Sequence, residues 1–163
     1  MKELSFLGRL RKDGALELVD PSEAISKSYL EKSNNSLKGA KILVKNDLFE
    51  ESISLSYYSM YNCLLSLLFR IGIKSENHSG SIILFKKLLG NQELFDLISF
   101  AKEERIDKQY YVTSKDDSLT RKSANKMIKV AQKFVVKMKL ILKRLKNEDI
   151  ENLRSKFKKI TSK

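Results

Sequence analysis

The chain is almost free of residues that break helices. Its 163 residues include one proline and six glycines. Sandwiches, barrels and glycine-rich nucleotide-binding folds need many tight turns, and glycine and proline supply most of them. The scarcity of both residues therefore argues against those folds and predicts long helices. A chain of this length can bury one substantial hydrophobic core, so we expect a single domain.

Apolar residues recur at helical spacing in five segments, and this periodicity is the main signal for the fold class. We expect helices over residues 21–45, 48–71, 79–89 and 92–111, and a fifth through 124–145. Asp20 is the expected N-cap of the first helix, and Gly72 is the expected C-cap of the second. The second segment is apolar around most of its circumference, which is typical of a helix in the middle of a bundle. The pattern predicts an all-α fold, an antiparallel up-and-down bundle of four or five helices.

The remaining segments carry weaker signals. Residues 1–20 are expected to form an irregular N-terminal segment, in which 15–19 could be extended. Residues 73–77 should connect two helices, and residues 113–117 should form a polar loop. The bundle is expected to occupy residues 21–146, and residues 147–163 then form a basic C-terminal tail. Leu153, Phe157 and Ile160 stand at helical spacing in this tail, which could therefore be an amphipathic helix.

The positive charge is concentrated in the last quarter of the chain. The formal net charge is +12, and residues 121–163 carry 15 Lys and Arg against three Asp and Glu, whereas the preceding residues balance. A basic segment favours anionic partners such as RNA, nucleotides, an acidic protein or an anionic membrane surface. Five lysines lie opposite the apolar seam of the last helix and could follow a nucleic-acid backbone, or could form a solvated face. They are Lys122, Lys126, Lys129, Lys133 and Lys137.

Several classes of protein are excluded by what the sequence lacks. The chain has one cysteine and one histidine, so it can form neither a disulfide framework nor a metal site of several cysteines or histidines. It also lacks the glycine-rich phosphate loops and the zinc-protease motif, and no cofactor is expected. The longest apolar stretch, residues 63–69, is far shorter than the about 20 residues of a membrane span, and the N-terminus does not resemble a signal peptide. We therefore expect a soluble, cytoplasmic protein.

Two polar motifs in the first half of the chain could carry chemistry. In residues 56–62, Tyr57, Tyr58 and Tyr61 could stack bases or line a nucleotide pocket. Alternatively, they are core residues whose hydroxyls reach the edge of the bundle. His78 stands at the start of a helix, where backbone N–H groups attract anions. It could act as a general acid or base, contact a phosphate, or cap the turn.

A third motif is the densest polar stretch on any expected helix. Arg105 and Gln109 are four residues apart and share one face, while Asp107 and Tyr111 share another. Arg105 could hold a phosphate in a forked geometry. Alternatively, the stretch forms surface ion pairs within the helix.

In sequence order, these motifs resemble the signatures of the HEPN family, named for higher eukaryotes and prokaryotes nucleotide-binding. The resemblance lies in residues 56–61, in 78–80 with the apolar run that follows, and in 104–111. It is strongest to the small stand-alone prokaryotic members and covers residues 21 to about 145 of this chain. It implies a helical bundle that often forms a homodimer and that pairs with a minimal nucleotidyltransferase in a complex of toxin–antitoxin type. Some members of the family are metal-independent endoribonucleases, in which an arginine is followed about four to six residues later by a histidine.

In this chain the histidine of that motif is replaced. Arg105 matches the arginine, Tyr110 stands five residues later, and no histidine follows. A phenol with a pKa near 10 is a poor general base at neutral pH. The resemblance therefore implies a module that dimerises, partners a minimal nucleotidyltransferase and binds a nucleotide or RNA.

Two alternatives to this binding module remain open. One is a metal-independent endoribonuclease toxin that uses Arg105 with Asp107, Tyr110 or a recruited His78. The other is a generic RNA-binding bundle driven by the lysines. The expected catalytic pair is Arg105 and Tyr110, and the expected ligand-binding residues are Arg105, Asp107, Gln109, Tyr111, His78, Tyr57 and Tyr61.

Overall fold

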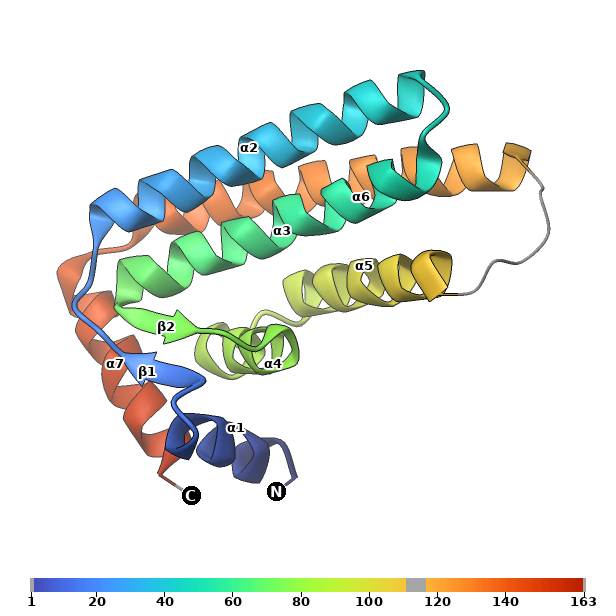
Figure 1. The fold of residues 1–163 in the computed structure, drawn as a ribbon. Helices are drawn as coiled ribbons and strands as arrows, with labels where there is room; N and C mark the ends of the chain where they lie inside the picture. The colour runs from blue at the N-terminus through green and yellow to red at the C-terminus, as the bar shows by residue number, and fades with distance from the viewer. Residues whose placement is uncertain (1, 111–116, 163) are drawn as a thin grey trace.

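A computed structural model describes residues 2–110 and 117–162, with the side chains of 2–106 and 120–162. The all-α fold class is confirmed, because helices dominate and the one sheet in the described residues has two short strands. Helices α2, α3 and α6 lie side by side with α5 beneath them, and α1, α4 and α7 gather at one end (Figure 1). The elements are α1 (Lys2–Lys12), β1 (Leu16–Leu18), α2 (Glu23–Lys45), α3 (Phe49–Ile71), β2 (Ile73–Ser75), α4 (His78–Leu89), α5 (Gln92–Tyr110), α6 (Asp117–Arg144) and α7 (Asn147–Thr161).

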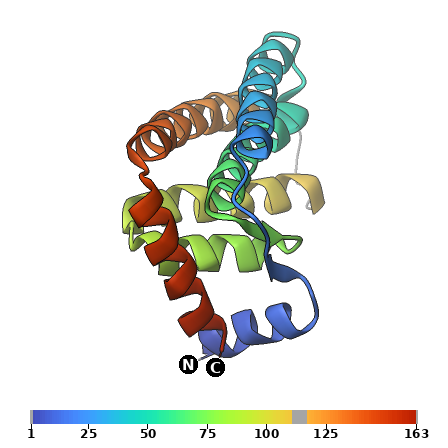
Figure 2. The same ribbon diagram turned by 90° about the vertical axis from the view of Figure 1, so that its left-hand side faces the viewer.

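The five expected helices correspond to α2 through α6, and the structure adds two more at the ends of the chain. The expectation of an irregular segment over residues 1–20 is wrong, because α1 forms there and buries Leu7 and Leu10. The basic tail forms α7, which buries Ile150 and Phe157. Both helices are short, and they pack against each other (Figure 2). Their stability therefore comes from packing rather than from helix propensity.

Two smaller expectations about the chain are also corrected. Strand β1 falls within the extended piece expected at 15–19, but it pairs antiparallel with β2, where only a connector was expected. The N-cap of α2 is Ser22, whose hydroxyl accepts from the backbone N–H of Ile25 at 3.2 Å, and not Asp20. The polar loop expected at 113–117 lies outside the described residues except for Asp117, where α6 begins.

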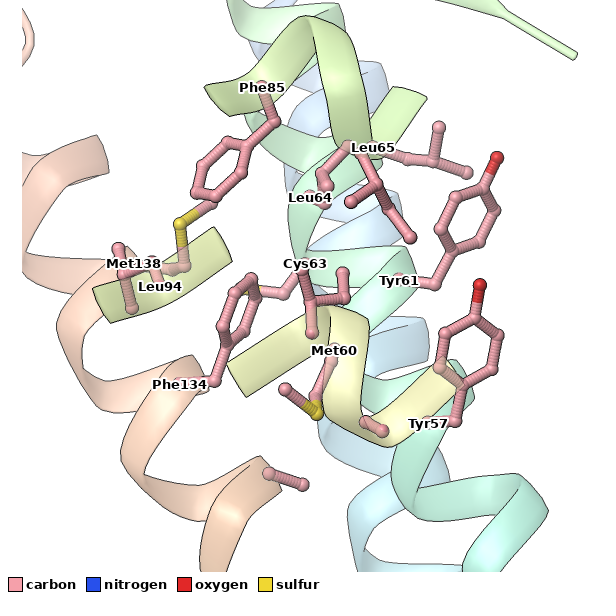
Figure 3. Close-up of a cluster of buried hydrophobic side chains, with 14 of the residues drawn as sticks. Tyr57, Met60, Tyr61, Cys63, Leu64, Leu65, Phe85, Leu94, Phe134 and Met138 are labelled. Atoms are coloured by element: carbon pink, nitrogen blue, oxygen red, sulfur yellow. The ribbon is translucent and has the colours of Figure 1, made fainter. Parts of the chain in front are cut away.

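Helix α3 is the centre of the molecule, as its apolar circumference predicts. It packs against α2, α4, α5, α6 and α7. In Figure 3, Met60, Cys63 and Leu64 of this helix face Phe134 and Met138 of α6. The expected seam of α6 is confirmed as core at its first five positions, which are fully buried: Ala124, Met127, Ala131, Phe134 and Met138.

The contact between α2 and α3 is lined with serines. Ser33 donates to the carbonyl of Ser59 at 2.7 Å, and Ser66 donates to that of Ser26 at 2.8 Å. Small side chains let two helices approach closely, and the hydroxyls of Ser33 and Ser66 are each satisfied by a carbonyl of the neighbouring helix. These bonds join α2 to α3 at two points seven residues apart on α3.

The C-terminal end of α3 is fastened by α7. Gly72 caps α3 in the left-handed conformation at φ 83°, as the sequence predicts. Arg154 of α7 donates through one nitrogen, Nη1, to the carbonyls of Val19, Ile71 and Gly72 at 2.8, 2.9 and 3.0 Å. A cationic donor therefore satisfies the carbonyl of Ile71 at the end of α3 and joins this end of the helix to the segment at Val19.

We predict that Gly72→Ala lowers the free energy of unfolding by at least about 2 kcal/mol. A Cβ at this position would lie 2.1 Å from Nη1 of Arg154 and 2.5 Å from the carbonyl oxygen of Val19, in addition to the strained φ. Gly90→Ala is the matched control, since Gly90 has φ 65° but open space around it. That control should lose about 1 kcal/mol. Urea titration of both variants measures the difference, and equal losses would contradict the role of Arg154.

Candidate functional site: a corner of tyrosine, histidine and arginine

The motifs singled out in the sequence meet where α3, α4 and α5 converge. We call Tyr57, Tyr58, Tyr61, His78 and Arg105 the corner cluster. The rings of Tyr57 and Tyr61 lie together on one side of α3, away from the core residues that face α6 (Figure 3). The structure thus brings together four of the predicted site residues: Arg105, His78, Tyr57 and Tyr61.

Four other predicted site residues cannot be placed in this cluster. Asp107, Gln109 and Tyr110 belong to α5, but their side chains lie outside the described part of the chain. Tyr111 lies outside the described residues altogether. Their roles stay predictions.

His78 is held by two tyrosines. Its Nδ1 lies 2.7 Å from the hydroxyl of Tyr57. Its ring stacks on that of Tyr61, with centroids 3.8 Å apart and planes inclined by 10°. The turn before α4 is capped instead by Asn77, whose side chain accepts from the backbone N–H of Gly80 at 2.8 Å. The capping role considered for His78 is therefore wrong, and its imidazole is a partly exposed member of the cluster.

Arg105 points toward α3 because it continues the buried face of α5 formed by Leu94, Ile98 and Ala101. Its guanidinium lies over the ring of Tyr58 at 4.8 Å and near that of Tyr57 at 5.4 Å. Nη2 donates to the hydroxyl of Tyr58 at 3.0 Å. The Nε atom is buried and has no hydrogen-bond partner among the described residues.

Burial sets the charge state of the corner cluster. The pKa of Tyr57 is raised by desolvation and by Tyr61, and the pKa of Tyr61 is raised mainly by desolvation. Desolvation, followed by the positive charges of Arg105 and Lys102, lowers the pKa of His78. At neutral pH the phenols of Tyr57 and Tyr61 are therefore protonated, the imidazole is neutral, and the guanidinium of Arg105 carries the positive charge of the cluster. Such a set presents a positive charge that the protein itself does not neutralise within the cluster.

A chain of hydrogen-bonded hydroxyls connects the cluster to the neighbouring serines. Tyr61 and Ser81 share a hydrogen bond of 3.1 Å, and Ser81 and Ser75 share one of 2.6 Å. This chain of hydroxyls ties α3 and α4 to β2, and it could not be predicted from sequence because it depends on the pairing of two strands. Lys102 donates to the hydroxyl of Ser79 at 2.6 Å beside the cluster. Neither Lys102 nor Tyr58 was among the expected site residues, although Tyr58 belongs to the tyrosine motif.

Two shallow grooves border the cluster. One has a volume of about 250 Å³ and runs between α4 and α5, with Phe95 and Ile106 among its apolar residues and Ser79 and Lys102 at the cluster. The other, of about 360 Å³, is lined by Glu50, Glu51, Ser54, Leu55 and Tyr58. The cluster is therefore reachable from the surface, and the groove beside Tyr58 is acidic because Glu50 and Glu51 line it.

The lysines of α6 do not form an uninterrupted basic track. Lys133 and Lys137 both pair with Glu93 of α5, at 2.8 and 2.5 Å, and Lys126 lies over the ring of Phe100. Lys122 and Lys129 line an open groove of about 930 Å³ at the other end of this helix. The positive face is thus partly neutralised by α5.

A metal site, a reactive cysteine and a membrane-spanning helix are all absent from the described residues. Within residues 2–110 and 117–162 no group of three or more His, Cys, Asp or Glu is placed to hold a metal ion. Burial raises the pKa of Cys63 to about 12, so this thiol is not a nucleophile at neutral pH. None of the described helices combines the length and apolar character required to cross a bilayer.

Comparison with known proteins identifies relatives across most of the chain. The family model described as the HEPN domain matches residues 26–142. A UPF0332 protein from Pyrococcus horikoshii is 26% identical over 144 residues, which are 87% of this chain and all of that protein. A candidate toxin from Methanocaldococcus jannaschii is 26% identical over 122 residues, 72% of this chain and 89% of that protein. A UPF0332 protein from Gloeobacter violaceus is 39% identical over 56 residues, 34% of this chain, and the chain spans only 44% of its length.

We predict that His78→Gln makes stability less sensitive to acid. Folding lowers the pKa of His78, so its stabilising effect is complete above the ordinary pKa of about 6.5. It is lost as the pH falls from there toward the folded-state pKa, because the unfolded chain binds the proton first. Urea unfolding at pH 7.5 and pH 5.0 should show a larger loss for the wild type than for the variant. Equal losses would show that His78 is not desolvated.

Proposed function

Because the chain belongs to the HEPN domain family, we propose that it is the toxin-side member of a toxin–antitoxin pair. In this proposal it dimerises and binds a nucleotide or RNA at the corner cluster. Its cognate partner is a minimal nucleotidyltransferase. The relative from Methanocaldococcus jannaschii, named as a candidate toxin, supports the toxin assignment.

The observation that carries the proposed ligand class is the environment of Arg105. The guanidinium is oriented by the faces of Tyr57 and Tyr58, and its buried Nε has no partner among the described residues. Arginine binds phosphate through paired N–H donors and stays charged at every physiological pH. An anion with several oxygen acceptors therefore suits this position. Asp107, Gln109 and Tyr111, in the same stretch of sequence, are proposed to add further contacts.

Protein partners are supported by two other features. The net charge of +12 favours an acidic partner surface. Val136 and Leu140 stand one turn apart on α6 and are 59% and 49% exposed, a larger apolar exposure than their neighbours on the seam have. Both features fit a chain that works in a complex.

The endoribonuclease alternative is favoured by one specific observation. His78 and Arg105 contact the same tyrosine, Tyr57, although they are distant in the sequence. A histidine recruited in this way could take the place of the one that Tyr110 replaces. Metal-independent cleavage needs a base for the 2′-hydroxyl, an acid for the leaving 5′-oxygen and a cation for the charged phosphorane. Tyr110 and Asp107 are the further candidates for the proton transfers.

Binding and cleavage can be separated with a single-stranded RNA probe in the presence of EDTA. We predict that Arg105→Ala weakens RNA binding at least about tenfold, because it removes a charge-assisted contact. Arg9→Ala is the control, since Arg9 is exposed on α1 and carries an equal charge. Equal weakening in both variants would assign the binding to net charge alone.

The same samples decide between the two functions. Intact RNA after incubation with the wild type supports the binding module. Cleavage by the wild type that is lost in both Arg105→Ala and His78→Ala supports the endoribonuclease.

Toxicity and partnership are tested in cells. We predict that expression of the chain alone arrests growth and that Arg105→Ala relieves the arrest, whereas Arg9→Ala does not. A minimal nucleotidyltransferase encoded beside the chain should co-purify with it and restore growth. Normal growth on expression of the wild type, together with separate elution of the two proteins, would refute the toxin–antitoxin assignment.

A further inference from the structure

The hydrogen bond between Tyr57 and His78 has a direction that the surroundings determine. The hydroxyl of Tyr57 and Nδ1 of His78 are 2.7 Å apart, and the residue Tyr57 is fully buried. Among the described residues, Nδ1 is the only hydrogen-bond acceptor found for this hydroxyl. If Nδ1 carried the proton instead, the phenolic proton would be left unpaired in a dry site, at a cost of about 1–3 kcal/mol. The favoured arrangement has Tyr57 as the donor and Nδ1 as the acceptor.

A neutral imidazole that accepts at Nδ1 carries its proton on Nε2. The groups that face His78 favour this neutral form: the phenols of Tyr57 and Tyr61 are uncharged, the ring of Tyr58 lies edge-on, and Arg105 and Lys102 are cations that oppose a second proton. Among the described residues Nε2 has no hydrogen-bond partner, and His78 is partly exposed. Its N–H is therefore open to a ligand.

We propose that Tyr57 is a positioning residue, which holds His78 in the Nε2–H tautomer so that this N–H and the guanidinium of Arg105 donate to one phosphate group. The inference rests on the proposed function and specifies its ligand: a phosphate oxygen of a nucleotide or RNA. The Nε2–H of His78 and the guanidinium of Arg105 are both hydrogen-bond donors. The site therefore favours ligands with acceptor oxygens over ligands that carry a protonated amine. In this tautomer His78 donates a hydrogen bond from Nε2–H to a ligand oxygen, and Nε2 has no free lone pair with which to accept a proton.

The ring plane of His78 is fixed independently of its protonation. Tyr61 stacks on it, and the hydroxyl of Tyr61 is tied through Ser81 to Ser75. Tyr61→Phe keeps the stacked ring and leaves the bond from Tyr57 untouched. It is therefore the matched control for Tyr57→Phe, because each variant removes one buried hydroxyl from the same helix.

The inference can be tested directly because His78 is the only histidine of the chain. Two-bond proton–nitrogen correlation spectra of protein labelled with ¹⁵N-histidine contain a single imidazole and report its tautomer. At pH 7.5 we expect the Nε2–H pattern in the wild type and in Tyr61→Phe, and a mixture of tautomers in Tyr57→Phe. An Nδ1–H or mixed pattern in the wild type would overturn the inference, whatever the protein binds.

The ligand is tested in the same spectra with inorganic phosphate and with a short single-stranded RNA. Both probes should shift the Nε2 resonance, and Tyr57→Phe should weaken RNA binding about fivefold, in the range of one neutral hydrogen bond. If RNA binding depends on Arg105 but leaves Nε2 unshifted, the inference fails and the proposed function stands. If neither probe binds, the proposed ligand class fails along with this use of the tautomer.

Discussion

The removal of α3 from water is the constraint on which the rest of the structure depends. This helix is apolar around most of its circumference, so it is stable only when other helices cover every side. Helix α2 closes one side through a seam of serines, and α6 closes another with Phe134 and Met138. Helices α4 and α5 cover the remaining side of α3, and this packing places His78 of α4 and Arg105 of α5 beside the tyrosines of α3. The candidate site is thus a by-product of covering one helix.

The same burial gives the corner cluster its chemical character. Tyrosine rings that serve as core residues keep their hydroxyls protonated, and a half-buried imidazole beside two cations stays neutral. Arg105 lies on aromatic faces that orient its guanidinium without neutralising it. What results is one permanent positive charge surrounded by fixed dipoles. Such an arrangement suits an anion, because no group of the cluster neutralises the positive charge of Arg105.

Parts of this arrangement follow from spacing alone, and parts do not. The periodicity of Tyr57 and Tyr61 predicts core positions, and the face shared by Ile98 and Ala101 places Arg105 toward α3. The contact between Tyr57 and His78 depends on how β2 directs the chain into α4, and a pairing of three-residue strands leaves almost no trace in sequence. Helices α1 and α7 were similarly hard to predict, because each is stabilised mainly by contacts with segments distant in the sequence. The domain division at residues 20 and 146 stays a prediction.

The hydrogen bonds from Arg154 to three carbonyls have a consequence for the order in which the chain folds during synthesis. Helix α3 leaves the ribosome long before α7, so in the nascent chain its last turn has no cationic donor. Strand β2 and His78 follow directly from that turn. The surroundings of the histidine are therefore completed only when a segment made much later returns to bind there. A nascent chain shortened before Arg154 would hold every residue of the corner cluster but lack the clasp that fixes the path between Ile71 and His78.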